Sequence, residues 1–267
     1  MIRDITVGQY YAADSAMHRL DPRVKIIATM VFVVMLFIIN DVYTYAFSII
    51  SLVACIKISK VPSKFIFRGI KSILFIVFLT GFLNIITTRG AHIIWQFGII
   101  KVTMEGIIMA VKMVVRLIML IIGSSLLTLT TTPIQLTDGI EELLKPFSKL
   151  GLPSAEIAMM MSIALRFVPT LLDETDKIMK AQQARGADFE TGGIKQKAKS
   201  LVPVLVPLFV SAFRRADELA TAMEARCYHG GNHRTRMNKM QLKKGDYKAC
   251  ITVAAYAVIT ILIMIIW

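Results

Sequence analysis

The chain has 267 residues, of which 55% are hydrophobic, and its mean hydropathy is +0.63. A soluble domain of this length does not need so much apolar surface, so the composition argues against an ordinary soluble protein and predicts an integral membrane protein. The excess of 31 Lys and Arg over 18 Asp and Glu, a net charge of +13, is typical of basic cytoplasmic loops rather than of nucleic-acid binding, and it leaves anionic lipid or an acidic protein as alternative partners.

The first half of the chain is predicted to cross the bilayer four times. Residues 1–23 are polar and lack the short apolar stretch of a cleavable signal peptide, so the first apolar run is expected to direct insertion. Asn40 and Asp41 interrupt an apolar stretch that is too long for one span of about 20 residues, which favours two short helices and a tight turn. The predicted spans are Val24–Ile39, Val42–Ile58, Ile73–Thr87 with a start near Gly69, and Thr103–Thr130. Arg89–Lys101 is predicted as a loop.

The next part of the chain is too polar to span but has helical periodicity. Ile134–Leu150 alternates apolar and charged residues at helical spacing, which predicts a helix along the membrane interface. Two long helices are expected over Ser154–Arg185 and Lys195–Arg226. Tyr228–Lys248 is basic and loop-like, and Ala249–Trp267 is apolar enough for a last span. We therefore predict an all-α integral membrane protein, with a bundle of about five transmembrane helices and a coupling domain that contains two long helices.

Basic residues determine the predicted orientation, because Lys and Arg gather in cytoplasmic loops. With five spans, the basic N-terminal segment, the loop from Lys57 to Lys71 and the stretch from Pro133 to Lys248 all fall on the same side. The N-terminus is then cytoplasmic and the C-terminus lies outside. The expected division is an N-terminal transmembrane domain over residues 1–132, a cytoplasmic or interfacial coupling domain over 133–245 and a C-terminal transmembrane helix over 246–267.

Each of the two long predicted helices ends in the pattern Ala-x-x-Ala-Arg. One copy starts at Ala181 and the other at Ala222. A cation in the last turn followed by glycine is an ordinary helix end, but a cap does not require alanine one and four residues before the arginine in both copies. Small alanines allow a partner to approach closely, and the arginine fork suits a carboxylate or carbonyl cluster. We predict two docking motifs, formed by Ala184, Arg185, Gly186, Ala225, Arg226 and Cys227.

The long helices also share an apolar first half that contains proline. These halves are Ile157–Leu172 and Leu201–Phe213, and their prolines, Pro169, Pro203 and Pro207, predict bends. The run Met159, Met160 and Met161 indicates either ordinary apolar packing or an adaptable surface that accepts several partners. Arg166 is expected to pair with Asp173 or Glu174 within its own helix, and otherwise to contact a partner.

Other charged or polar residues give weaker signals. Lys112 and Arg116 lie one turn apart in a predicted span, which indicates either a substrate pathway or side chains that reach toward water. His229 and His233 are separated by two glycines, so we expect no metal site. The chain has no phosphate-binding loop of the G-x-x-x-x-G-K-[ST] type and no catalytic constellation, so we expect it to be neither an ATPase nor another enzyme.

These motifs resemble those of the T component of energy-coupling factor (ECF) transporters, a branch of the ATP-binding-cassette class. The resemblance covers nearly the whole length. Ala184-Arg185-Gly186 and Ala225-Arg226-Cys227 are similar to the paired Ala-Arg-Gly motifs of that family, and the second departs from it at Cys227. Residues 14–15, 18–23 and 166–170 also look like the family's sequence.

The resemblance implies a coupling subunit for import of vitamins or other micronutrients in a prokaryotic cell membrane. Each motif would dock on one of two ATPase subunits, which use ATP and Mg²⁺, while this chain binds no cofactor. The membrane-proximal halves of the long helices, with Met159–Met161, Arg166 and the three prolines, would contact one substrate-binding (S) subunit, or several that exchange. The alternatives are a T component dedicated to cobalt or nickel, a self-contained secondary transporter and a membrane-embedded enzyme. A secondary transporter is expected to show repeats within the membrane, and an enzyme is expected to show a polar catalytic cluster at one depth. This sequence shows neither feature.

Overall fold

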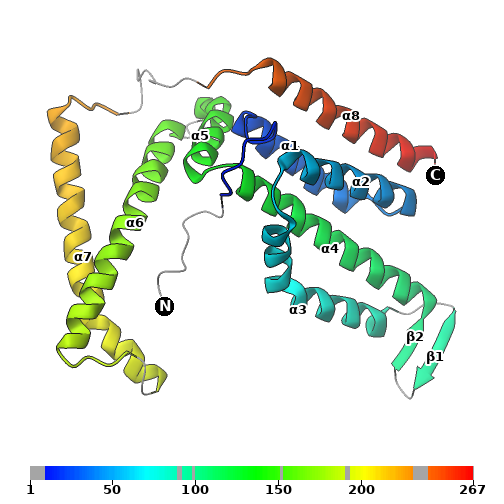
Figure 1. Cartoon of the computed structure of the whole chain (residues 1–267), viewed down its shortest axis with the longest axis horizontal. Coiled ribbons are helices and arrows are strands. Elements are labelled where there is room, and N and C mark those ends of the chain that lie inside the picture. Colours follow the sequence, from blue (N-terminus) through cyan, green and yellow to red (C-terminus); the bar gives the residue numbers. More distant parts are fainter. Residues whose placement is uncertain are drawn as a thin grey trace. The chain divides into compact units, whose positions relative to one another are not determined.

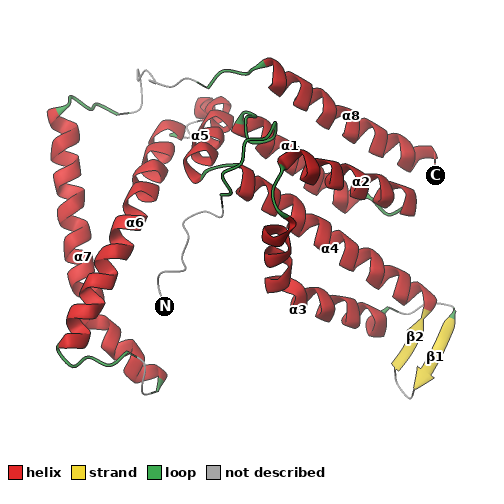
Figure 2. Cartoon of the chain, in the orientation of Figure 1, coloured by secondary structure: helices red, strands yellow, loops and turns green. Residues whose placement is uncertain are grey.

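The computed structural model describes residues 10–88, 92–97, 100–150, 153–189, 193–230 and 240–266. Helices dominate this part of the chain, in agreement with the predicted all-α class (Figure 1). They are α1 Pro22–Ile38, α2 Val42–Ser59, α3 Ser63–Thr87, α4 Met104–Thr130, α5 Pro133–Leu144, α6 Ser154–Ala184, α7 Ile194–Ala225 and α8 Lys244–Ile266. Two strands, β1 Ile93–Phe97 and β2 Ile100–Thr103, form an antiparallel hairpin where the sequence predicted a loop (Figure 2).

The described residues divide into two compact units. One contains those of Gly8–Gly139 and Lys239–Trp267, and the other contains those of Ile140–Asn238. The first unit thus holds α1 to α4, the hairpin and α8, and the second holds α6 and α7. The two long helices that carry the predicted docking motifs therefore lie together in the second unit.

Local chemistry explains where several helices begin and end. Asp21 caps α1, since its carboxylate accepts a hydrogen bond from the Arg23 amide at 2.9 Å, and Pro22 occupies the first helical position. Thr103 caps α4 in the same way through the Gly106 amide, at 3.2 Å. α5 stops at Leu144 and a short 3-10 helix, Lys145–Leu150, replaces the rest of the predicted interfacial helix. Pro146 lies in this segment, where it cannot donate the next helical hydrogen bond.

By length and apolarity, four of the described helices can cross a membrane, namely α2, α4, α6 and α8. A bent pair within α3, Ser63–Lys71 and Ile73–Thr87, can form a fifth span, with an angle of 58° between its parts. The number agrees with the predicted five, but the set includes α6 in place of α1. α1 has 17 residues, which is short for a span of about 20 residues. α3 also begins before Gly69, directly after Pro62.

The core of the first unit lies where α1, α2 and α4 meet. Leu36 and Ile39 are buried against Tyr45, Leu52 and Met119. α3 packs along α4, and α8 packs along α1 and α2. The first unit is therefore a helical bundle in which the last helix returns to the first two.

Candidate functional site

The two Ala-x-x-Ala-Arg motifs have the same backbone geometry. α6 and α7 both end at the last alanine of the motif, so Arg185 and Arg226 are the C-cap residues. The residue that follows has a positive φ in both copies, 87° at Gly186 and 57° at Cys227. Cys227 thus adopts the left-handed conformation for which glycine is preferred.

The hydrogen bonds that close the two helices also match. The Ala187 amide donates to the Gln182 carbonyl at 2.9 Å, and the Tyr228 amide donates to the Met223 carbonyl at 3.1 Å. These bonds satisfy carbonyl groups that the helix leaves open at its C-terminus. The departure from glycine at Cys227 therefore leaves the shape of the second motif unchanged.

Both motif arginines present their side chains to solvent. Arg185 and Arg226 are exposed, as are Ala184, Ala225 and the two residues in the left-handed conformation. Within the described part of the chain, neither guanidinium group forms a hydrogen bond or an ion pair, and the helix ends are closed by backbone amides. The arginines are therefore not used as side-chain caps, and both are available to a partner.

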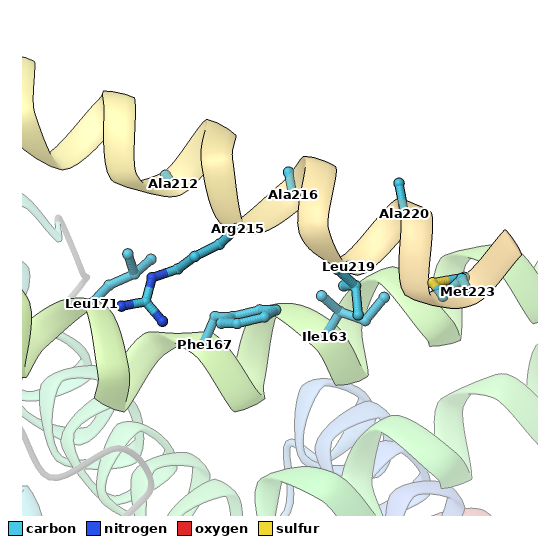
Figure 3. Close-up of a pocket in the computed structure, with 9 residues that line it drawn as sticks. All are labelled: Ile163, Phe167, Leu171, Ala212, Arg215, Ala216, Leu219, Ala220 and Met223. Atoms are coloured by element: carbon cyan, nitrogen blue, oxygen red, sulfur yellow. The ribbon is translucent and has the colours of Figure 1, made fainter. Parts of the chain in front are cut away.

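α6 and α7 cross in antiparallel directions. Leu171, Phe167 and Ile163 of α6 follow one another in the order opposite to Arg215 and Leu219 of α7 (Figure 3). Near the end of α6, Gln182 Nε2 donates to the Pro203 carbonyl of α7 at 3.3 Å. The antiparallel crossing places Arg185 and Arg226 at opposite ends of the helix pair.

An ion pair joins the helices at their crossing. Arg215 Nη2 donates to Glu174 Oε2 at 2.9 Å, and the Ser211 hydroxyl donates to Glu174 Oε1. The expectation that Arg166 pairs with Asp173 or Glu174 is wrong for Glu174, which is engaged by α7. Arg166 itself is exposed, and none of the ion pairs among the described residues includes it. The sequence interpretation missed the partner because it lies on another helix.

A cavity of about 280 Å³ opens between α6 and α7 beside this ion pair. Its walls are mostly apolar, and Arg215 reaches across it toward Leu171 (Figure 3). The cavity is partly open to the outside, so the side chains of α6 and α7 do not fill the space on this side of the ion pair.

The apolar half of α7 is largely exposed, and the apolar half of α6 exposes Met160 and Met161. Phe213 is 70% exposed and Met160 is 60% exposed, whereas Met159 is half-buried. Other large apolar side chains are exposed on the same halves, namely Met161, Leu201, Val202, Leu205, Val206, Phe209 and Val210. Pro169, Pro203 and Pro207 lie inside the helices, and α7 bends in Figure 1. Contiguous apolar surface of this kind marks a protein or membrane contact.

Lys112 and Arg116 hold the turn between α1 and α2. Lys112 Nζ donates to the Asn40 carbonyl at 2.7 Å, and Arg116 Nη2 donates to the Ile39 carbonyl at 2.7 Å. Arg116 Nε also donates to the Tyr45 hydroxyl at 3.0 Å. These contacts support a structural role, since both cations are bound to the backbone of the α1–α2 turn.

The segment before α1 joins α1 to α4 and α8. Asp246 of α8 is 2% exposed and accepts from the Asp21 amide at 2.7 Å. Lys25 Nζ donates to the Thr130 carbonyl at 2.9 Å and to the His18 carbonyl at 3.2 Å. At the exposed end of the segment, hydrogen bonds from Arg19 lower the pKa of the Asp14 carboxyl. The residues that resemble the family before the first span thus serve the fold of the first unit.

The histidine pair considered for a metal is described in part. His233 lies outside the described residues. The His229 ring Nδ1 is hydrogen-bonded to the Cys227 carbonyl at 2.7 Å. The described part of the chain holds no group of three or more His, Cys, Asp or Glu side chains that could bind a metal ion.

Comparison with known proteins gives long matches. Residues 13–237 match the CbiQ family, which is described as cobalt transport protein. The "energy-coupling factor transporter transmembrane protein EcfT" of Clostridium kluyveri is 56% identical over 270 residues, covering 100% of this chain and 99% of the relative. The EcfT protein of Thermosediminibacter oceani is 53% identical, covering 100% of this chain and 100% of the relative. The EcfT protein of Bacillus subtilis is 47% identical, covering 96% of this chain and 97% of the relative.

Proposed function

The chain belongs to the CbiQ/EcfT family of energy-coupling factor transporter transmembrane proteins, and from this premise we propose that it is the subunit that transmits ATP-driven motion to a substrate-binding subunit. Its partners are two cytoplasmic ATP-binding-cassette subunits and one membrane-embedded S subunit, or several that exchange. The imported substrate is a vitamin or another micronutrient. ATP and Mg²⁺ are used by the ATPase subunits, and this chain catalyses no step.

The observation that carries the proposal is the pair of matched, exposed arginine motifs. Arg185 and Arg226 share one cap geometry and have unused guanidinium groups within the described residues. A guanidinium binds a carboxylate or carbonyl cluster with forked geometry, which suits a groove on a partner protein. Two equivalent motifs fit two similar partner subunits.

The antiparallel crossing of α6 and α7 supports the same proposal. Because the motifs lie at opposite ends of the helix pair, each can dock on a separate subunit. When ATP closes the ATPase dimer, the two ends move relative to each other. The exposed apolar halves, which include Met160 and Phe213, contact the S subunit, and their displacement tips that subunit within the bilayer.

The test is a comparison of complexes purified in detergent through a tag on this chain. Wild type, Arg185→Ala, Arg226→Ala and the double variant are compared for co-purified ATPase subunits and ATP hydrolysis. Removing one buried, paired arginine from an interface costs about 2–5 kcal/mol, so each single variant weakens docking and the double variant loses both subunits. Arg214→Ala is the control, because Arg214 is an exposed arginine of α7 outside the motif.

Two results would overturn the proposal. One is a wild-type chain that brings down no ATPase subunit. The other is a double variant that retains both subunits as wild type does, since the arginines would then be ordinary helix ends. In the second case the self-contained secondary transporter becomes the better candidate.

A second candidate, uptake of cobalt or nickel, is favoured by the description of the matching family as cobalt transport protein. The two candidates share the coupling mechanism and differ in the S subunit. The membrane protein that co-purifies with the wild-type chain therefore distinguishes them. A vitamin-binding S subunit would contradict dedicated metal uptake, and a metal-binding one would support it.

A further inference from the structure

The two long helices are related by an internal repeat, and the structure shows that two equivalent positions of this repeat contact each other. Glu174 and Arg215 are separated by 41 residues, the same spacing as that between Arg185 and Arg226. They therefore occupy equivalent positions in the two copies. When two equivalent helices cross in antiparallel directions, they are related by an approximate two-fold axis, and equivalent positions meet at the crossing.

A repeat with the same charged residue in both copies would be unfavourable at this point, because a residue near the two-fold axis faces the equivalent residue of the other copy. Two glutamates or two arginines there would repel each other at short range. The chain has glutamate in the first copy and arginine in the second, and the two side chains pair at 2.9 Å. The divergence of this one position turns a repulsive contact into an attractive contact between the copies.

α7 binds both carboxylate oxygens of Glu174. Arg215 binds Oε2, and Ser211, one turn earlier on the same face of α7, binds Oε1. The side chains of Glu174 and Arg215 are 23% and 37% exposed, so water screens the pair less than it screens a pair on an open surface. These bonds join α6 and α7 at the crossing, and the exposed Gln182–Pro203 hydrogen bond, at 3.3 Å, is a second polar contact near the end of α6.

The packing around this point leaves room for the helices to rotate. The cavity of about 280 Å³ lies between α6 and α7 on the side that leads to Leu219 and Met223 (Figure 3). An ion pair at the crossing and an unfilled apolar groove beside it together suit a change of crossing angle about the crossing point.

We propose that Glu174 and Arg215 are positioning residues that form the pivot of the coupling helices, so that displacement of one docking motif changes the angle of both helices. This inference rests on the proposed function. The pair does not touch nucleotide or substrate. The ion pair keeps the two helices joined at the crossing while their ends move. Without it, the helices slide past each other or separate under the same displacement.

The test measures the distance between the two helix ends in the purified complex. Spin labels are placed at Lys180→Cys and Thr221→Cys, which are exposed and occupy equivalent positions before the two motifs, in a background without the native cysteines. The distribution of distances is recorded by pulsed electron paramagnetic resonance, with and without a non-hydrolysable ATP analogue and Mg²⁺. Wild type shows a shift of this distribution when the analogue is added.

The variants reverse one charge or both. Glu174→Arg and Arg215→Glu retain the ATPase subunits and their ATP hydrolysis but lose the shift, because like charges face each other at the crossing. The double variant Glu174→Arg/Arg215→Glu restores opposite charges and regains the shift. Asp173→Arg and Arg214→Glu are matched controls, since these neighbours are exposed and have the same 41-residue spacing, and both keep the shift.

The outcomes separate this inference from the proposed function. Single variants that keep the shift overturn the pivot, as does a double variant that fails to regain it. Single variants that lose the ATPase subunits together with the shift also overturn it, because the pair would then be needed for assembly of the helix pair. A wild-type complex without ATPase subunits overturns the proposed function and the pivot together.

Discussion

Cys227 takes up a backbone conformation that an L-amino acid side chain disfavours. Its φ of 57° lies in the left-handed region, as does the φ of 87° at Gly186. A Cβ atom in this region crowds the neighbouring carbonyl and costs about 1–2 kcal/mol. The second docking motif therefore stores a small strain that the first does not.

Two separate substitutions, one at each of these positions, test this strain. Cys227→Gly is expected to raise the free energy of unfolding by about 0.5–1 kcal/mol, since it removes the Cβ but gives the unfolded chain more freedom. Gly186→Ala is expected to lower it by about 1 kcal/mol, and a Cβ built at Gly186 meets nothing within 4 Å, so the cost is that of the backbone alone. Unfolding in detergent measures both. A Cys227→Gly variant less stable than wild type would show that the thiol has contacts of its own.

The residues of the site differ in how well the sequence could predict them. The positions of Arg185 and Arg226 at the helix ends follow from a local signal, two alanines and an arginine, while their docking role stays a prediction. The pairing of Glu174 with Arg215 depends on how α6 and α7 pack. From the sequence alone, Arg166 is the nearer candidate partner for Glu174, because both lie on the same helix. The same spacing of 41 residues separates the two motifs and the two paired residues, and it is the one signal in the sequence for this pair. It predicts a contact only when the helices are known to cross in antiparallel directions.

At the scale of elements, apolar runs predicted most helices, while their breaks depended on packing and proline. The bounds of the helices predicted at α1, α2, α4 and α8 agree closely with the structure, although α1, with 17 residues, is not among the helices long enough to span. The bend in α3 between Lys71 and Ile73 and the hairpin of β1 and β2 were not predicted. No proline or glycine stands between Lys71 and Ile73, so the sequence offers no local signal for the bend in α3. For the hairpin, Gly98 follows β1 in the sequence, but a single glycine in a predicted loop does not show that the segments on either side pair as strands.

The contact between α1 and α4 depends on a residue without a side chain. A Cβ built at Gly123 of α4 would lie 2.8 Å from Cε1 of Phe32 and 2.9 Å from Cδ1 of the same ring. Gly123→Ala is therefore expected to lower the free energy of unfolding by about 1–3 kcal/mol, because the ring or the helix must move. Gly245→Ala in α8 is the control, since nothing lies within 4 Å of its Cβ, and it should leave stability equal or slightly higher. Equal effects of the two changes would show that α1 and α4 are not closely packed at Phe32.

At the scale of the whole molecule, the proposed function requires that both docking motifs face the cytoplasm. The distribution of basic residues predicts that they do, but α6 is also long and apolar enough to cross a membrane. Its apolar half, Ile157–Leu172, is about 24 Å long at 1.5 Å per residue. The hydrocarbon core is about 30 Å thick, and the charged residues Asp173, Glu174 and Asp176 follow directly. A helix of this composition is better placed along the cytoplasmic face than across the bilayer.

Cysteine labelling in cells tests this orientation. In chains that keep one cysteine each, Gln183→Cys and the native Cys227 are expected to resist a membrane-impermeant maleimide in intact cells and to react after permeabilisation. Both positions are exposed, and the predicted orientation places them in the cytoplasm. Ile266→Cys, at the exposed end of α8, is the control and reacts in intact cells if the C-terminus lies outside. If Gln183→Cys reacts from outside, α6 crosses the bilayer. Arg185 would then be out of reach of a cytoplasmic ATPase, and docking through two motifs would be impossible.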